Sequence, residues 1–112
     1  MNWTERQKKY PKSIVLIKKW LHLKLDKEGD FGLNQISKLF HTERRLFDFF
    51  DGEGIFIEIE YDPNLDVGES QWNWLIYNTE GFVYNKEGYH SRIEAEEAGW
   101  NKAFEILEQI EN

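Results

Sequence analysis

The chain has 112 residues, of which 16% are aromatic and 31% are charged, and this composition fits one folded domain over residues 1–112. Intrinsic disorder is a poor interpretation, because each buried aromatic ring removes about 150–250 Å² from water. No apolar run approaches the roughly 18–20 residues of a membrane span, and the first residues lack the apolar stretch of an export signal. The absence of cysteine excludes disulfides and thiolate metal sites and favours a reducing cytoplasm.

The formal net charge of −7 at pH 7 is unevenly distributed. Residues 1–25 hold seven bases and one acid, a balance of +6, whereas the remaining chain holds seven bases and twenty acids, a balance of −13. Such asymmetry marks either a basic arm for an acidic partner or a basic segment that lies against its own acidic domain. We favour the second interpretation and treat residues 1–12 as a candidate peripheral arm. The overall negative charge opposes binding to nucleic acid or to an anionic membrane.

Helix is expected near the N-terminus. The segment Thr4-Glu5-Arg6-Gln7 matches a capping box, and Pro11 interrupts or begins the next element. Ser13 is then a candidate cap for a helix over residues 14–25, because apolar residues there recur at helical spacing. Its predicted apolar face consists of Ile14, Ile17 and Leu21. Residues 21–25 also alternate like a strand, but we predict helix throughout.

A second helical region is expected after a glycine- and aspartate-rich loop over residues 26–32. From Asn34 onward the helical period returns, and Thr42 is a candidate cap for a fresh helix within this region. The segment Asp51-Gly52-Glu53-Gly54 ends it, because glycine adopts the left-handed conformation that is common after helices.

A strand is predicted over residues 55–62, followed by a hairpin. Isoleucines alternate with Phe56, Glu58 and Glu60, so one face is apolar and the other mostly acidic, as in an antiparallel sheet with one solvated face. The hairpin turn Asn78-Thr79-Glu80-Gly81 suits a type I turn with a glycine bulge. This turn pairs Asn78 with Phe82, Ile76 with Tyr84, and Trp74 with Lys86.

The C-terminal segment is predicted to be an amphipathic helix that begins at the capping box Ser91-Arg92-Ile93-Glu94. Its small residues would let it approach a sheet closely; they are Ala95, Ala98, Gly99 and Ala103. Together the elements predict an α+β fold of order α-α-β-β-β-α, with a three-stranded antiparallel sheet and helices packed on one face.

Several motifs that suggest chemistry are better explained by structure. Asp30-Phe31-Gly32 matches a kinase tripeptide, but the lysine strand and catalytic loop of a kinase are absent. Residues 62–66 begin like a calcium loop, yet the positions that need glycine and glutamate hold Val67 and Asn73. His22, His41 and His90 lack the spacing of a zinc site, and His90 is interpreted as a local hydrogen-bonding residue. We therefore expect no metal and no other cofactor.

Two further groups of residues have a catalytic or binding alternative. Glu58 and Glu60 lie on one strand face about 7 Å apart, within the range of glycosidases, but such alternation is also the ordinary way to solvate a sheet face. Trp72, Trp74, Phe82 and Tyr84 could form a stacking platform for single-stranded nucleic acid or sugar. Because only Lys86 lies nearby to hold phosphates, we favour core packing for the hairpin.

The sheet face turned away from the helices is the best site hypothesis. It is a mixed apolar and acidic surface, of the kind that binds a protein partner or forms a homodimer seam. Its expected members are Phe56, Glu58, Glu60, Leu75, Tyr77 and Val83.

The chain also contains a pattern of structural motifs over about residues 15–110: Lys18-Lys19-Trp20-Leu21, Gly54-Ile55-Phe56-Ile57-Glu58-Ile59, the Trp/Tyr hairpin, and Tyr89–Gly99 leading into a helix. In this pattern the chain resembles small uncharacterised proteins carried by bacterial phages and prophages. The resemblance implies a genomic setting and carries over no activity, cofactor or functional residue.

Three function hypotheses follow. The first is a non-enzymatic protein-interaction module of phage or prophage type that binds through the open sheet face. The second is an acidic mimic of nucleic acid that inhibits a DNA-binding protein or nuclease. The third is a small enzyme of unknown reaction that uses Glu58 and Glu60 or His90, and it requires a concave pocket around those groups.

Overall fold

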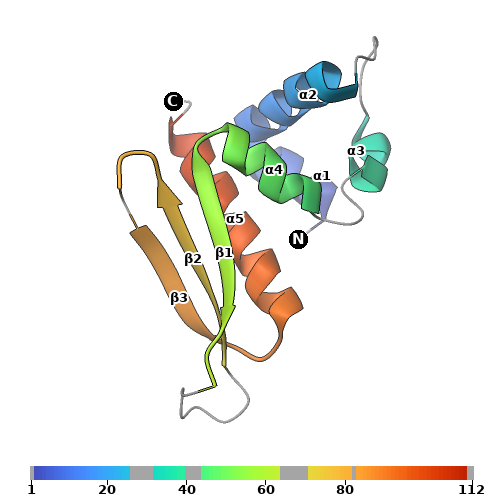
Figure 1. Ribbon diagram of the computed structural model, residues 1–112. Coiled ribbons are helices and arrows are strands. Elements are labelled where there is room, and N and C mark those ends of the chain that lie inside the picture. The colour runs from blue at the N-terminus through green and yellow to red at the C-terminus, as the bar shows by residue number, and fades with distance from the viewer. Residues whose placement is uncertain (1, 26–31, 40–43, 64–70, 82, 111–112) are drawn as a thin grey trace.

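A computed structural model describes residues 2–25, 32–39, 44–63, 71–81 and 83–110 (Figure 1). Its elements are α1 (Trp3–Lys9), α2 (Pro11–Leu25), α3 (Leu33–Leu39), α4 (Arg44–Gly52), β1 (Ile55–Tyr61), β2 (Trp72–Asn78), β3 (Val83–Tyr89) and α5 (Arg92–Ile110). The α+β fold is confirmed, with helical regions, then three antiparallel strands, then a helix. Both helical regions before the sheet are divided into two helices. None of the helices in these ranges is long and apolar enough to cross a membrane.

The strands pair in the order β1-β2-β3, and the predicted hairpin register is confirmed. Ile76 lies opposite Tyr84, and Trp74 lies opposite Lys86. The third predicted pair includes Phe82, which lies outside the described residues. The turn fixes the register of the hairpin. A slip of one residue would move the apolar side chains to the other face of the sheet, because side chains alternate along a strand.

Glycines with positive φ shape both ends of the hairpin. At the turn, the Gly81 N–H donates to the Asn78 carbonyl at 3.1 Å, and Gly81 has a φ of 89°. At the other end, Trp72 faces Tyr89 whereas Asn73 faces Glu87, so Gly88, with a φ of 98°, is the extra residue of a β-bulge. The predicted glycine turn is confirmed, and the bulge is an additional feature.

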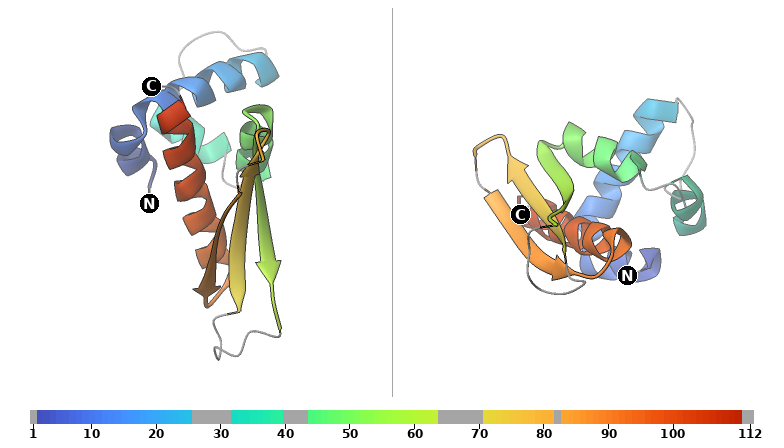
Figure 2. Two further views of the ribbon diagram at one scale, coloured as in Figure 1. Left: turned by 90° about the vertical axis from the view of Figure 1, so that its left-hand side faces the viewer. Right: turned by 60° about the horizontal axis from the view of Figure 1, so that its bottom comes forward.

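Helix α5 packs along the sheet and lies between it and α1 (Figure 2). Ala95, Gly99 and Ala103 are buried on its packed side. A Cβ placed on Gly99 would lie 3.4 Å from the Trp74 Cβ and 3.6 Å from the Ile57 Cγ2. The predicted close approach of the small-residue face to the sheet is thus confirmed, and Gly99 sets how near the helix lies to β2.

Substitutions at Gly99 should show this spacing directly. We expect Gly99→Ala to change the free energy of unfolding by less than about 1 kcal/mol, because better helix propensity offsets a tight but allowed contact. Gly99→Leu should lower it by about 2–3 kcal/mol, since the larger side chain overlaps Trp74 and Ile57. Urea denaturation measures both, with Gln109→Leu on the exposed part of α5 as the control. Equal stability of Gly99→Leu and the wild type would contradict the spacing.

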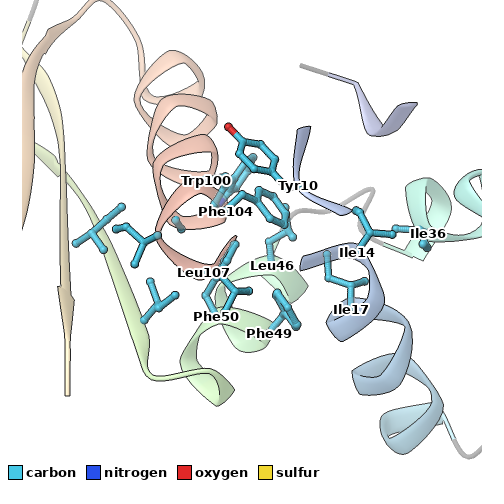
Figure 3. Packing of buried hydrophobic residues seen from close by; sticks show 14 of the residues in the cluster. Tyr10, Ile14, Ile17, Ile36, Leu46, Phe49, Phe50, Trp100, Phe104 and Leu107 are labelled. Atoms are coloured by element: carbon cyan, nitrogen blue, oxygen red, sulfur yellow. The ribbon is translucent and has the colours of Figure 1, made fainter. Parts of the chain in front are cut away.

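The hydrophobic core joins the helices to the sheet and is centred on aromatic rings (Figure 3). Phe104 is fully buried and stacks on Tyr10 at 5.6 Å between ring centroids, with an interplanar angle of 15°. Its ring also meets Phe50 edge to face at 4.9 Å. The predicted α2 face is confirmed, because Ile14, Ile17 and Leu21 are all buried in the same core.

The N-terminal helices begin at other residues than the capping patterns predicted. Asn2, not Thr4, caps α1, because its Oδ1 accepts a hydrogen bond from the Glu5 N–H at 2.8 Å. Helix α2 begins at Pro11, whose fixed φ suits a first helical position, so Ser13 lies inside the helix and does not cap it.

The basic N-terminal segment lies against acidic residues of α5, as the favoured interpretation expected. The Arg6 guanidinium is 3.0 Å from the Glu97 carboxylate, and Arg6 is buried beside the Trp3 and Phe104 rings. About three turns further along α5, the Glu108 carboxylate accepts hydrogen bonds from Lys12 N–H and from both the N–H and the hydroxyl of Ser13. Glu108 thereby binds the first turn of α2 from another helix.

Candidate functional site

The outer sheet face is the side of the sheet turned away from α5 (Figure 2). The register places Phe56 opposite Tyr77, Glu58 opposite Leu75, and Glu60 opposite Asn73. All of the predicted members whose side chains are described therefore share this face. Val83 pairs with Tyr77 in the backbone register, but the prediction for its side chain lies outside the described residues.

The centre of the outer sheet face is apolar. The rings of Phe56 and Tyr77 lie 5.9 Å apart at an interplanar angle of 36°, and both side chains are half-buried. Leu75 is half-buried beside them, and these three side chains are not part of the hydrophobic core. Glu58 and Glu60 are exposed at the margin, so carboxylates flank the apolar centre.

Tyr77 is linked to the acidic margin by a hydrogen bond in which its hydroxyl donates to the Glu58 carboxylate. This hydrogen bond, followed by lost hydration and by the negative charges of Glu58, Glu60 and Asp51, raises the pKa of Tyr77 above its ordinary value of 10.0. A phenol with a raised pKa is favoured in its protonated form by the folded protein. The resulting contribution to stability is complete below pH 10 and is lost as the pH rises through the folded pKa.

The effect of Glu58 on the pKa of Tyr77 can be measured by following tyrosinate absorbance during a pH titration. We expect Tyr77→Phe to remove a phenol that titrates later than an ordinary tyrosine. Glu58→Gln should move the pKa of Tyr77 back toward the ordinary value, because the charged acceptor is gone. Glu80→Gln, at the exposed hairpin turn, is the control and should leave the titration unchanged. An unchanged curve for Glu58→Gln would contradict the hydrogen bond.

Glu58, Glu60 and His90, the residues of the enzyme hypothesis, do not line the concave surface between β3, α5 and the end of α1. Glu58 and Glu60 lie exposed on the outer sheet face. His90 is exposed just before α5, where its N–H donates to the Glu94 carboxylate at 3.1 Å, in keeping with a local hydrogen-bonding role. The Ser91 cap is confirmed, because its hydroxyl accepts from the Glu94 N–H at 3.2 Å.

Metal-binding side chains are dispersed in the part of the chain that the structure describes. There, no group of three or more His, Asp or Glu side chains is arranged to hold a metal ion. Three of the motifs considered above lie wholly or partly outside the described residues. They are His41, the first two residues of Asp30-Phe31-Gly32, and the part of the calcium-like segment that follows Pro63.

A concave surface, which we call the inner groove, lies between β3, α5 and the end of α1. It has a volume of about 670 Å³, and its walls include Tyr84 and Lys86 of β3, Lys102 of α5 and Lys9 of α1. From the sequence, Lys86 was the single basic residue expected near the hairpin. Lys9 and Lys102 reach the same place only through the packing of α1 and α5, so local spacing held no signal for this basic site.

The two tryptophans of the hairpin have different environments, and Trp74 also contributes to the wall of the inner groove. Trp74 is 6% exposed, packs against Gly99, and donates from its Nε1 to the Tyr89 hydroxyl at 3.0 Å. The expectation that Trp74 belongs to the core is confirmed.

The expectation of core packing is wrong for Trp72 and Tyr84. Trp72 is half-buried outside the core, with its ring 5.2 Å from that of Tyr61, and Tyr84 is exposed in the inner groove. Phe82 lies outside the described residues.

Comparison of the chain with protein-family models, with curated proteins and with solved structures found no match. The resemblance to phage- and prophage-borne proteins therefore stays a prediction, and function has to be argued from the two surfaces themselves.

Proposed function

We propose that this protein is a non-enzymatic interaction module of the cytoplasm that binds a partner protein through its outer sheet face. The observation that carries this proposal is the half-buried cluster of Phe56, Leu75 and Tyr77, which lies outside the core and is flanked by Glu58 and Glu60. Apolar centres with a polar rim are the usual anatomy of protein interfaces, and aromatic residues are enriched in them.

The charge of this face defines the partner. Glu58, Glu60 and Glu87 border the apolar centre on the side of Leu75 and Asn73, and all three are exposed. A partner with an apolar patch bordered by lysine or arginine side chains complements both parts of the face. A symmetric homodimer through the same face would bring these carboxylates of two copies together, so self-association is disfavoured.

The experiment uses a photo-reactive amino acid in place of Leu75, with Val15 on the exposed part of α2 as the control position. Cross-linking in the producing cells identifies the partner, whose affinity is then measured with purified proteins. We expect Tyr77→Glu to weaken binding by more than about 30-fold, because a carboxylate replaces a central ring. Glu60→Lys should weaken it by about ten-fold, whereas the matched reversal Glu80→Lys should not.

Three results would contradict the proposal. A partner that binds Tyr77→Glu as tightly as the wild type uses another surface. A dimer in analytical ultracentrifugation that Tyr77→Glu dissolves would make a second copy the occupant. Binding that falls steeply with salt but ignores Tyr77→Glu would favour the acidic mimic of nucleic acid, because screening acts on charges and not on apolar contacts.

A further inference from the structure

We infer that the inner groove and the adjacent edge of β3 form a second binding site, which takes an extended acidic peptide segment as a fourth strand of the sheet. This site is independent of the outer sheet face. Strand addition uses backbone hydrogen bonds for affinity and alternate side chains for specificity.

The first observation is the edge of β3. Within the described residues β3 pairs with β2 along one side, and no strand pairs along its other side. Alternate residues of an antiparallel edge strand direct their N–H and C=O groups away from the sheet. Residues 84–88 are exposed, and no described strand covers this edge.

The second observation is that the inner groove runs beside this edge. Tyr84 and Lys86 of β3 face it, and Ala98, Asn101 and Lys102 of α5 line its floor. Because side chains alternate along a strand, every second residue of an added strand would point into the groove over α5. The remaining residues would continue the outer sheet face beside Asn85 and Glu87.

The third observation is the sign of the charge. Lys9, Lys86 and Lys102 line the groove, and Glu105, 3.4 Å from Lys102, is the acidic residue among its lining side chains. This basic site lies in a chain of formal charge −7. Residues that point into the groove are therefore expected to be Glu or Asp, whereas residues beside Glu87 are expected to be neutral or basic.

Four of the described aromatic residues line the groove, and three of them have a covered or buried ring, which argues against a nucleotide as the ligand. The Lys102 ammonium lies over the Tyr84 ring at 5.3 Å from its centroid, and Tyr10 is already stacked on Phe104. Trp74 is buried beneath Gly99. A nucleobase would need an accessible ring face for stacking, whereas a carboxylate needs only the ammonium groups.

The bulge at Gly88 limits the length of the pairing. It interrupts the regular ladder of β3 between Glu87 and Tyr89. Bulges twist a strand and end regular pairing, so the added strand would align with residues 83–87.

The test uses an acetylated and amidated peptide of alternating Glu and Thr as the probe. We expect the peptide to bind the full chain and to shift the backbone amide resonances of residues 83–87. Lys86→Glu and Lys102→Glu should each weaken binding by about ten-fold at low salt. Lys19→Glu, on the exposed side of α2, makes the same change in net charge and should leave the affinity unchanged.

Further probes separate the alternatives. The same peptide methylated on alternate backbone nitrogens should lose binding, because N-methylation removes the donors of a strand ladder. Equal binding of the methylated peptide, no binding of the parent peptide, or tighter binding of an oligothymidylate that displaces it would each overturn the inference. Tyr77→Glu should leave peptide binding intact, so failure here is distinguishable from failure of the outer sheet face.

Discussion

Replacement of Phe104 by alanine should lower the free energy of unfolding by about 4 kcal/mol. Phe104 is fully buried and stacks on Tyr10, meets Phe50 edge to face, and lies 5.4 Å from the Arg6 guanidinium carbon. The truncation therefore leaves a cavity where α1, α4 and α5 meet. Since small domains are stable by only about 5–15 kcal/mol, this single change removes a large part of the total.

Urea denaturation followed by tryptophan fluorescence measures this loss. Leu23→Ala is the matched control, because Leu23 is 84% exposed and its truncation creates no cavity. Phe104→Leu keeps most of the volume and should cost less than Phe104→Ala. A loss below about 1 kcal/mol for Phe104→Ala would show that the three helices do not share one core.

The second large effect is expected at Glu108. Glu108→Ala should lower the free energy of unfolding by about 2 kcal/mol, because the Ser13 hydroxyl and the first N–H groups of α2 lose their acceptor. Ser13 is fully buried, so its hydroxyl is poorly placed to recover the bond from water. Hydrogen exchange should report the loss as faster exchange of the Lys12 and Ser13 amides.

A double-mutant cycle shows whether the loss of stability arises from the hydrogen bond between Ser13 and Glu108. Ser13→Ala and Glu108→Ala should be non-additive by about 1 kcal/mol or more, because they remove the same hydrogen bond. Glu105→Ala, which removes an exposed carboxylate 3.4 Å from Lys102, should cost less than about 0.5 kcal/mol. Strict additivity of the Ser13 and Glu108 variants would contradict the contact.

The sheet and α5 could be predicted because their signals are local. Alternation placed Phe56, Glu58 and Glu60 on one face of β1, and the glycine turn fixed the hairpin register. Both signals depend on residues close in the sequence. The outer sheet face follows from them, so its described members were found before any tertiary contact was known.

The N-terminal helix boundaries could not be predicted in the same way. Asn2, Thr4 and Ser13 are all good capping residues, and local sequence does not decide among them. At α2 the proline is a local start signal that competes with the Ser13 cap, and Glu108, more than ninety residues away, accepts hydrogen bonds from the first turn that begins at Pro11. The inner groove was missed because Lys9 and Lys102 meet Lys86 only after the ends of the chain have packed together.

The contact between the first helices and the last one has a consequence for biosynthesis. At typical translation rates α5 leaves the ribosome on the order of ten seconds after α2. During this interval Arg6 and Ser13 have no acceptors in Glu97 and Glu108, and the nascent lysine-rich segment stays hydrated. Native burial of this basic segment therefore has to wait for the synthesis of α5, and a nascent chain that stops before Glu97 leaves Arg6 without its native ion-pair partner.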